Sequence, residues 1–329
     1  MIDEGLIISK DLIINKMNSL GSQNKQFIFI INFNFDCAYI QELHKIDSKK
    51  IKFQIGTYSN YPFLQENPKN LSFQKFPLDY SEYLEKFNAI KKEIAFGNSF
   101  LLNLTFENRI ETNWSLAEIF NFCKSKNKLF FDDQFVLFSP ENFIEVKNGW
   151  ISTYPMKGTI EAEIKNAKEI ILHDEKESAE HATIVDLLRN DLSRVATEVH
   201  VKRYRYLDYI KTNQNNLIQV SSEICGKLQK SYSSHPGDLF ANLLPAGSIT
   251  GAPKTKTLQI ISDTENHTRG YYTGVFGVYN RGEIVSAVMI RFIENKDSKF
   301  YYKSGGGITH LSNPLQEYQE MIDKIYIPV

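Results

Sequence analysis

The stretch FVLFSPENFIEVKNGWISTYPMKGTI, residues 135–160, decides the fold. Short β-branched and aromatic runs alternate in it with the turn formers Ser-Pro, Lys-Asn-Gly and Tyr-Pro. Runs of this length are too short for helices and are typical of buried strands. The Asn-Gly pair between FIEV and WIST favours a tight hairpin, because both residues readily adopt positive φ. We therefore predict several strands here, two of them joined as a hairpin.

Outward from this stretch, predicted strands and helices are mixed. FIFIINFNF (27–35) is short and β-rich, which indicates a buried strand. Apolar residues at helical spacing predict a helix that is capped by Ser81 and ends at Gly97. Further strands are predicted over residues 101–110, 217–228, 272–280, 283–294 and 299–307. Further helices are predicted over residues 115–126, 161–196 with a break near His173 and Asp174, 236–244, from the loop 245–252 to about Thr264, and 313–325.

The order of these elements predicts the fold class. They lack the regular strand–helix period of a doubly wound fold, so we predict an α+β protein with a large antiparallel component. No internal repeat, low-complexity tract or obvious linker divides the chain, which favours one compact domain. Within it, residues 1–78 form a short N-terminal part packed into the same domain, and residues 79–329 carry the motifs described below.

Composition bounds the class of protein. The 329 residues are 42% hydrophobic, which allows a substantial core. Lys and Arg number 38 against 39 Asp and Glu, a net charge of −1 that argues against a dedicated nucleic-acid binder. The most apolar run, residues 27–35, is far shorter than a membrane span.

The cysteines and the first residues indicate the compartment. Cys37, Cys123 and Cys225 are odd in number and far apart, which suggests neither a disulfide framework nor a zinc site. The acidic start, MIDEGLIISKDL, lacks the layout of a signal peptide. We expect a reduced, cytoplasmic protein that binds neither nucleic acid nor membrane.

Two pairs of carboxylates are candidates for a metal site. Glu177 and Glu180 are three residues apart on a predicted helix, as are Glu317 and Glu320, so each pair shares a helix face. Carboxylates this close repel one another, and a bound Mg²⁺ held between the two pairs would compensate. The alternative is a pair of solvated acidic faces, the first of them balanced by Lys176.

Two glycine-bearing loops are candidates for binding an anion. PAGSITGAPK (245–254) leads into a helix, whose free N–H groups favour negative charge, although the glycine spacing is not that of a phosphate-binding P-loop. SGGGI (304–308) follows a strand, and its glycines permit close backbone approach to a ligand. A carboxylate is as good a ligand as a phosphate here, and ordinary turns are the alternative.

Lys157, in TYPMKGT (153–159), is a candidate nucleophile. A lysine among apolar neighbours can lose its proton near neutral pH, although a surface charge is the commoner case. The chain has no GxSxG motif and no cysteine in the GxCxG elbow that a glutamine amidotransferase uses. His181 fits a helix-face residue better than a metal ligand.

These segments, in this order, resemble the chorismate-binding enzymes from about Tyr80 to Lys324. That family includes anthranilate synthase component I, aminodeoxychorismate synthase component I, isochorismate synthase and salicylate synthase. The segments that carry the resemblance are DEKESAEHATIVDLLRNDLSRVA (174–196), GSITGAPK (247–254), RGYYTGVFG (269–277), the IR of VMIRF, SGGGI (304–308) and EYQE (317–320).

The resemblance implies a large α+β fold with two facing, mainly antiparallel sheets, helices outside them, and a Mg²⁺-dependent site for chorismate. It implies that the magnesium carboxylates are Glu177, Glu180, Glu317 and Glu320. It also implies that the substrate is bound by Thr250, Gly251, Tyr272, Arg291, Gly305, Gly306, Gly307 and Lys324.

Lys157 separates the members of the family. Anthranilate synthases resemble one another in having Ala at this position, whereas aminodeoxychorismate synthases typically have the lysine. The resemblance implies that Lys157 attacks C2 of chorismate, that Glu141 of SPENF protonates the leaving 4-hydroxyl, and that ammonia then adds at C4. Because no amidotransferase elbow is present, a separate glutamine amidotransferase subunit would supply the ammonia.

Departures from the family pattern keep alternatives open. Leu101 stands where isochorismate and salicylate synthases have a water-activating lysine and the aminating enzymes usually have Gln. Phe292 replaces a usual Thr, and the short N-terminal part makes a tryptophan pocket doubtful. After aminodeoxychorismate synthase, the order of preference is anthranilate synthase, then isochorismate or salicylate synthase. A catalytically silent relative is the alternative of another class.

Overall fold

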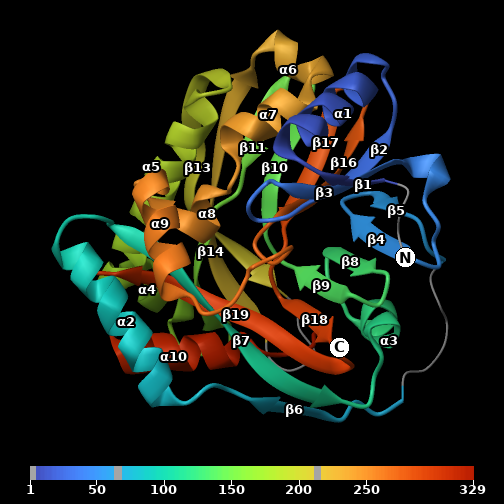
Figure 1. Ribbon diagram of the computed structural model, residues 1–329. Helices are drawn as coiled ribbons and strands as arrows, with labels where there is room; N and C mark the ends of the chain where they lie inside the picture. Colours follow the sequence, from blue (N-terminus) through green and yellow to red (C-terminus); the bar gives the residue numbers. More distant parts are fainter. Residues whose placement is uncertain (1–4, 63–68, 211–215) are drawn as a thin grey trace.

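Two antiparallel sheets lie face to face in the computed structural model, which describes residues 5–62, 69–210 and 216–329 (Figure 1). The first sheet has the order β1 (Leu6–Ile8), β3 (Cys37–Glu42), β2 (Phe27–Ile31), β16 (Val275–Asn280), β17 (Glu283–Val288), β10 (Asn142–Lys147), β11 (Trp150–Thr153), β14 (Leu217–Leu228) and β12 (Met156–Glu161), and β13 (Ala196–Ile210) pairs with β14. The second has the order β15 (Gly251–Ala252), β7 (Leu101–Thr112), β19 (Lys299–Thr309), β18 (Phe292–Lys296), β9 (Phe135–Ser139), β8 (Asn127–Phe131), β4 (Ile51–Ile55) and β5 (Tyr58–Ser59), and β6 (Phe73–Phe76) pairs with β7.

Helices cover the outer faces of the two sheets. Those against the first sheet are α1 (Lys10–Ser22), α4 (Ala167–His173), α5 (Glu175–Ser193), α6 (Lys230–Ser234) and α7 (Pro236–Leu243), and the short α8 (Gly247–Thr250) lies between α5 and the strands β7 and β15. Those against the second are α2 (Tyr80–Ala95), α3 (Leu116–Phe122), α9 (Lys254–Thr264) and α10 (Pro314–Asp323), and a short 3₁₀ turn spans Leu43–Lys45. The α+β architecture with two facing sheets is thus confirmed.

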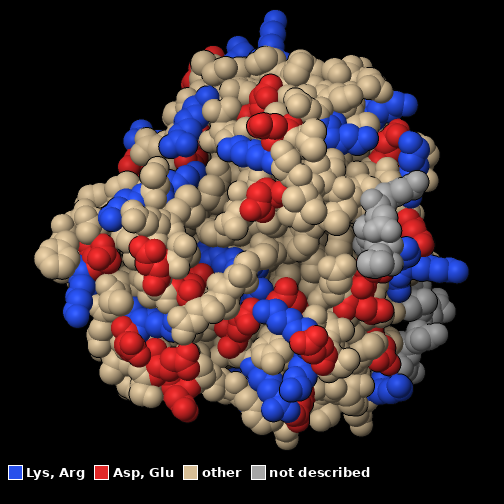
Figure 2. Space-filling view, in the orientation of Figure 1, with Lys and Arg blue, Asp and Glu red and all other residues tan. Residues whose placement is uncertain are grey.

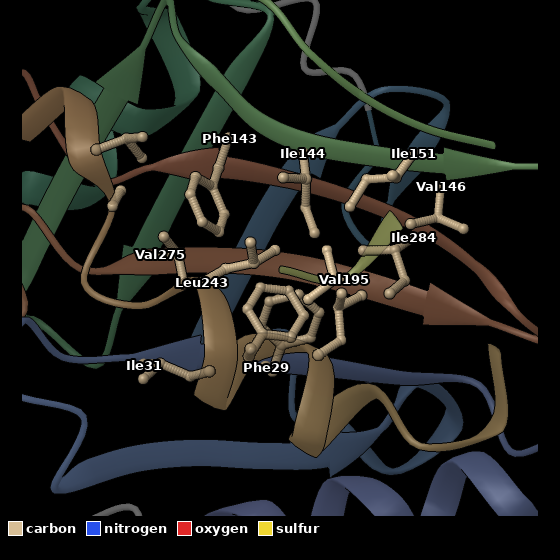
Figure 3. Close-up of a cluster of buried hydrophobic side chains, with 14 of the residues drawn as sticks. Phe29, Ile31, Phe143, Ile144, Val146, Ile151, Val195, Leu243, Val275 and Ile284 are labelled. Atoms are coloured by element: carbon tan, nitrogen blue, oxygen red, sulfur yellow. The ribbon is translucent and has the colours of Figure 1, made fainter. Parts of the chain in front are cut away.

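The strand β2 shows why its sequence is apolar at every position. Phe27, Phe29 and Ile31 point into the cluster between the first sheet and α7, part of which Figure 3 shows. Ile28 and Ile30 point the other way, into the cluster between the two sheets. Successive side chains of a strand face opposite sides, so a strand covered on both sides reads as one apolar run.

Two chain segments pass from one sheet to the other at the same place. Between β9 and β10 the chain crosses at Pro140 and Glu141, and between β17 and β18 it crosses next to Arg291, whose φ is 54°. The crossings are tied together, since the Val288 N–H donates to the Glu141 carbonyl over 3.1 Å and the Phe138 N–H donates to the Arg291 carbonyl over 3.2 Å. Glu141 and Arg291 therefore both lie at the seam between the sheets.

Several local predictions are confirmed. Asn148 and Gly149 have φ values of 52° and 77°, as a tight hairpin between β10 and β11 requires. The helical region after Glu161 is broken at Asp174, whose side chain caps α5 by accepting from the Glu177 N–H.

Other local predictions are wrong. The helix predicted to be capped by Ser81 is α2, which begins at Tyr80 with Asp79 as its N-cap residue. The predicted single strand 283–294 is two strands in different sheets. The strand β13 was not predicted, because its charged residues and bulges at 197–206 hide the alternation. The helix α1 was not predicted either.

The N-terminal part contributes to both sheets, with β1, β2 and β3 in the first and β4, β5 and β6 in the second. On the face in Figure 2, Lys and Arg are interspersed with Asp and Glu, without a large region of one sign. Within the described ranges, no helix has the length and apolarity that a membrane crossing requires.

Candidate active site

A cavity of about 210 Å³ opens at the seam between the sheets. It brings together eleven of the fourteen residues predicted to bind, react or hold metal. These are Glu141, Lys157, Thr250, Gly251, Tyr272, Arg291, Gly305, Gly306, Gly307 and Lys324, with Glu320 of the metal set also in the wall. Glu177, Glu180 and Glu317 lie behind this wall and do not line the cavity, and Glu180 and Glu317 form ion pairs with the lysines described below.

Glu141 is placed by the crossing between the sheets. Its carboxylate oxygen Oε1 accepts a hydrogen bond of 2.6 Å from the hydroxyl of Ser248 on α8. Burial raises the pKa of Glu141, while Ser248, Arg291 and Lys324 oppose the shift. The charged groups that act on this carboxyl, Arg291 and Lys324, are cations, so burial and not a neighbouring acid is the cause of the raised pKa.

Lys157 is neither a surface charge nor a lysine among apolar neighbours. It lies on β12 beside the cavity, and its Nζ forms an ion pair with Oε2 of Glu180, whose side chain is only 3% exposed. Burial lowers the pKa of Lys157, but the carboxylates of Glu180, Glu320 and Glu177 together outweigh it and raise that pKa above its ordinary value. The apolar surroundings that would free the amine of its proton are therefore absent in this state.

The two carboxylate pairs face one another, and the lysines between them are Lys157, Lys176 and Lys324. Lys176 Nζ lies 2.9 Å from Oε1 of Glu317 and 4.0 Å from Oε1 of Glu180, which joins α5 to α10. Lys324 Nζ lies 2.7 Å from Oε1 of Glu320. These contacts place both pairs in one cluster, and neither pair forms a separate solvated face.

The cluster has the donors that a hard divalent cation takes. Oε1 of Glu180 is buried and accepts no hydrogen bond from the described residues. Burial raises the pKa of Glu177, and its Oε2 lies close to Gly158, where an added Cβ would be 3.4 Å away. Among the described residues no three acidic, histidine or cysteine side chains already converge as a metal site, since lysines hold the carboxylates. In donor type and charge the residues fit Mg²⁺.

The glycine loop forms a flat wall of the cavity. A Cβ at Gly305 would lie 2.2 Å from the Leu104 carbonyl, so β19 can approach β7 only as glycine there. A Cβ added at Gly306 would have as its nearest atoms Glu317 Oε2 at 3.6 Å and Lys324 Nζ at 3.8 Å. Lys324 Nζ also donates to the Gly305 carbonyl over 2.9 Å, which fixes this ammonium group at the glycine wall.

The loop before α9 contributes backbone as well as side chains. Gly251 has φ of 128°, and a Cβ there would lie 1.8 Å from the Leu101 carbonyl, so its glycine is required by the pairing of β15 with β7. The Thr250 hydroxyl donates to the Ala246 carbonyl over 2.9 Å, within its own short helix. The loop therefore keeps its shape through its own hydrogen bonds.

Arg291 and Tyr272 complete the wall near the seam. Arg291 Nε donates to the Tyr326 hydroxyl over 3.4 Å, and Tyr272 is 3% exposed. Leu101 and Phe292, the two residues that depart from the family pattern, differ in their position relative to the cavity. Leu101 lines the cavity, whereas Phe292 is fully buried and stacks on Phe135 outside it. Leu101 alone of these two can touch a ligand in the cavity.

Sequence reasoning missed four polar residues of the site. Ser248 lies inside GSITGAPK, and its motif was the signal that could have found it. Lys176 was read only as a partner of an acidic face. Asn103 and Gln219 also line the cavity, on β7 and β14. No motif marks these two amides. They can be assigned to the cavity only from the alternation of side chains along each strand, once the strand face that lines the cavity is known.

Comparison with known proteins decides the family. Residues 19–328 match the family described as chorismate binding enzyme. The chain belongs to this family. This chorismate binding enzyme is 46% identical over 316 residues to a Haemophilus influenzae protein named "Uncharacterized PabA-like protein", with 96% of each chain covered.

Relatives with named activities are more distant. The chorismate binding enzyme is 32% identical over 258 residues to aminodeoxychorismate synthase component 1 of Salmonella typhimurium, covering 74% of this chain and 56% of that one. The crystal structure of anthranilate synthase component I from Streptococcus pneumoniae superposes with a TM-score of 0.66 at 28% identity, covering 78% of this chain and 59% of that one. This chain therefore spans little more than half the length of these two synthases.

Proposed function

We propose that this chorismate binding enzyme is component I of an aminodeoxychorismate synthase. It would convert chorismate and ammonia to 4-amino-4-deoxychorismate, towards p-aminobenzoate and folate. The observation that carries the proposal is Lys157, which lines the same cavity as Glu141, Arg291 and Lys324. The similarity to the Salmonella synthase supports it.

The cavity and the cluster behind it suit a substrate with two carboxylates. The carboxylates are Glu177, Glu180, Glu317 and Glu320, and the cations are Lys157, Lys176, Lys324 and Arg291. Because these charges balance, a dianionic ligand needs additional positive charge. A Mg²⁺ held by the four carboxylates would supply it and would polarise a substrate carboxylate. Arg291, Lys324 and the glycine wall would orient the ligand.

Lys157 and Glu141 would perform the chemistry. The Nζ of Lys157 forms a bond to C2, the ring double bonds shift, and the C4–O bond breaks. Glu141 gives its proton to the departing hydroxyl, which leaves as water. Ammonia then adds at C4 and the C2–Nζ bond breaks, so that chorismate and ammonia yield aminodeoxychorismate and water. For the first step Nζ must leave its ion pair with Glu180 and lose its proton.

A separate glutamine amidotransferase subunit would deliver the ammonia. This part of the proposal rests on the similarity to aminodeoxychorismate synthases and on the absence of an amidotransferase cysteine motif in the sequence. Ammonium at high concentration would replace that subunit in an assay, because the ammonia it supplies is the same nucleophile.

The second candidate is anthranilate synthase component I, which the superposed crystal structure favours. One experiment separates the two. The purified protein is incubated with chorismate, Mg²⁺ and ammonium, and the product is identified by mass and fluorescence. Aminodeoxychorismate supports the proposal, whereas anthranilate, isochorismate or salicylate contradicts it. No turnover, with or without a glutaminase partner, would indicate a silent relative.

A further inference from the structure

Ser248 makes a contact that the chemistry above leaves unexplained. Its Oγ lies 2.6 Å from Oε1 of Glu141, a residue 107 positions away in the chain, and both side chains line the cavity. Ser248 is on the four-residue α8, which the Thr250 hydroxyl stabilises through its bond to the Ala246 carbonyl. The contact thus joins the GSITGAPK loop to the seam between the sheets.

The direction of this hydrogen bond has a chemical consequence. No other acceptor for the Ser248 hydroxyl occurs among the described residues, so its hydrogen is donated to Oε1. In a neutral carboxyl group the better acceptor is the carbonyl oxygen, and the proton then resides on the other oxygen. Oε2 accepts no hydrogen bond from residues 5–62, 69–210 or 216–329, which leaves it available to a ligand.

We propose that Ser248 is a positioning residue that keeps the proton of Glu141 on Oε2 and stabilises the carboxylate left after that proton departs. The inference rests on the proposed function, in which Glu141 protonates the leaving hydroxyl. Before transfer, the hydrogen bond holds Oε1 as the carbonyl oxygen. After transfer, the same hydroxyl donates to an anion, and a hydrogen bond to a charged group is the stronger kind.

The charged groups around Glu141 also stabilise its carboxylate, so the contribution of Ser248 has to be distinguished from theirs. Arg291, from the crossing between β17 and β18, and Lys324, at the end of α10, both favour its ionised form. Both are also the cations that would meet a dianionic substrate, which would partly neutralise them when it binds. Ser248 is neutral and keeps its donor in every state of the cavity.

The test compares Ser248→Ala with Ser248→Thr. In the alanine variant we expect kcat to fall about tenfold, the KM for chorismate to change little, and the alkaline limb of the kcat–pH profile to move up by about one pH unit. Threonine keeps the hydroxyl and should restore both quantities. An unchanged limb in Ser248→Ala, or a loss confined to chorismate binding, would overturn the proposal.

Ser139→Ala is the matched control. Ser139 Oγ accepts from the backbone N–H of Glu141 over 3.2 Å and does not reach its carboxylate oxygens. The alkaline limb should therefore stay in place in this variant. A limb that moves equally in both alanine variants would show a structural effect of losing either serine, and would contradict the assigned role.

A measurement without turnover separates this inference from the proposed function. A protonated carboxyl group has an infrared C=O band, and the band absent from Glu141→Gln belongs to Glu141. Its titration should shift to higher pH in Ser248→Ala. If the wild-type protein forms no aminated product, the proposed function fails while this shift still tests the hydrogen bond. If the product forms but the band and limb do not move, the serine inference alone fails.

Discussion

The ammonium group of Lys157 is ion-paired with the buried carboxylate of Glu180, which belongs to the acidic cluster behind the cavity. The candidate nucleophile and the candidate metal ligands are therefore one electrostatic unit. An ammonium group held by carboxylates is a poor nucleophile. A cation that binds these carboxylates would therefore weaken the ion pair that holds the Lys157 amine in its protonated form.

Removal of divalent metal should abolish turnover, and Glu317→Gln should raise the Mg²⁺ concentration needed for half-maximal turnover by about tenfold or more. Glu317 is 3% exposed, and its Oε1 contacts Lys176, so the substitution removes one negative charge from the cluster. The measurement is a Mg²⁺ titration of initial rate, together with the Mg²⁺-dependent shift in the melting temperature.

Glu175→Gln is the control for this prediction. Glu175 is exposed at the start of α5, the helix that carries Glu177 and Glu180, and the ion pairs described for the cluster do not involve it. Its substitution should leave the Mg²⁺ requirement unchanged. An equal Mg²⁺ requirement in Glu317→Gln and wild type would remove this carboxylate from the proposed metal site.

Glu141→Gln should lower kcat by about 100-fold to 10,000-fold, the range typical of a lost general acid. Burial raises the pKa of Glu141, so its protonated form persists to higher pH than an ordinary glutamate. Activity that needs this proton should fall as pH rises through the raised pKa, and the glutamine variant should lose that alkaline limb. A variant with wild-type kcat and the same limb would show that another group protonates the leaving hydroxyl.

Gly251→Ala should destabilise the protein by about 2 kcal/mol or more, because a Cβ there meets the Leu101 carbonyl at 1.8 Å and φ is 128°. Gly97→Ala is the matched control. Its φ is 79°, but nothing lies within 4 Å of the added Cβ, so only the backbone cost applies. Denaturant unfolding of both variants measures the difference. Equal stabilities would contradict the tight contact between β15 and β7.

The sequence allowed the fold class and several strands of both sheets to be predicted, since strand runs, the Asn148–Gly149 turn and the glycine loops have local signatures, and eleven of the fourteen candidate site residues line the cavity. It did not allow the crossings at Glu141 and Arg291 to be predicted, because the change of sheet is a tertiary event with no local pattern. The ion pair of Lys157 with Glu180 likewise depends on how β12 meets α5. For the same reason, spacing alone could not exclude a surface position for Lys157.

The regiochemistry of Lys157→Ala tests the central claim most directly. Wild-type protein, Lys157→Ala and Lys176→Ala are incubated with chorismate, Mg²⁺ and ammonium, and the products are identified by mass and fluorescence. Lys176 belongs to the same cluster but does not line the cavity, so its variant controls for the lost charge. The account predicts that amination at C4 is severely slowed only in Lys157→Ala, in which some anthranilate can form. Unchanged formation of 4-amino-4-deoxychorismate by Lys157→Ala would contradict it.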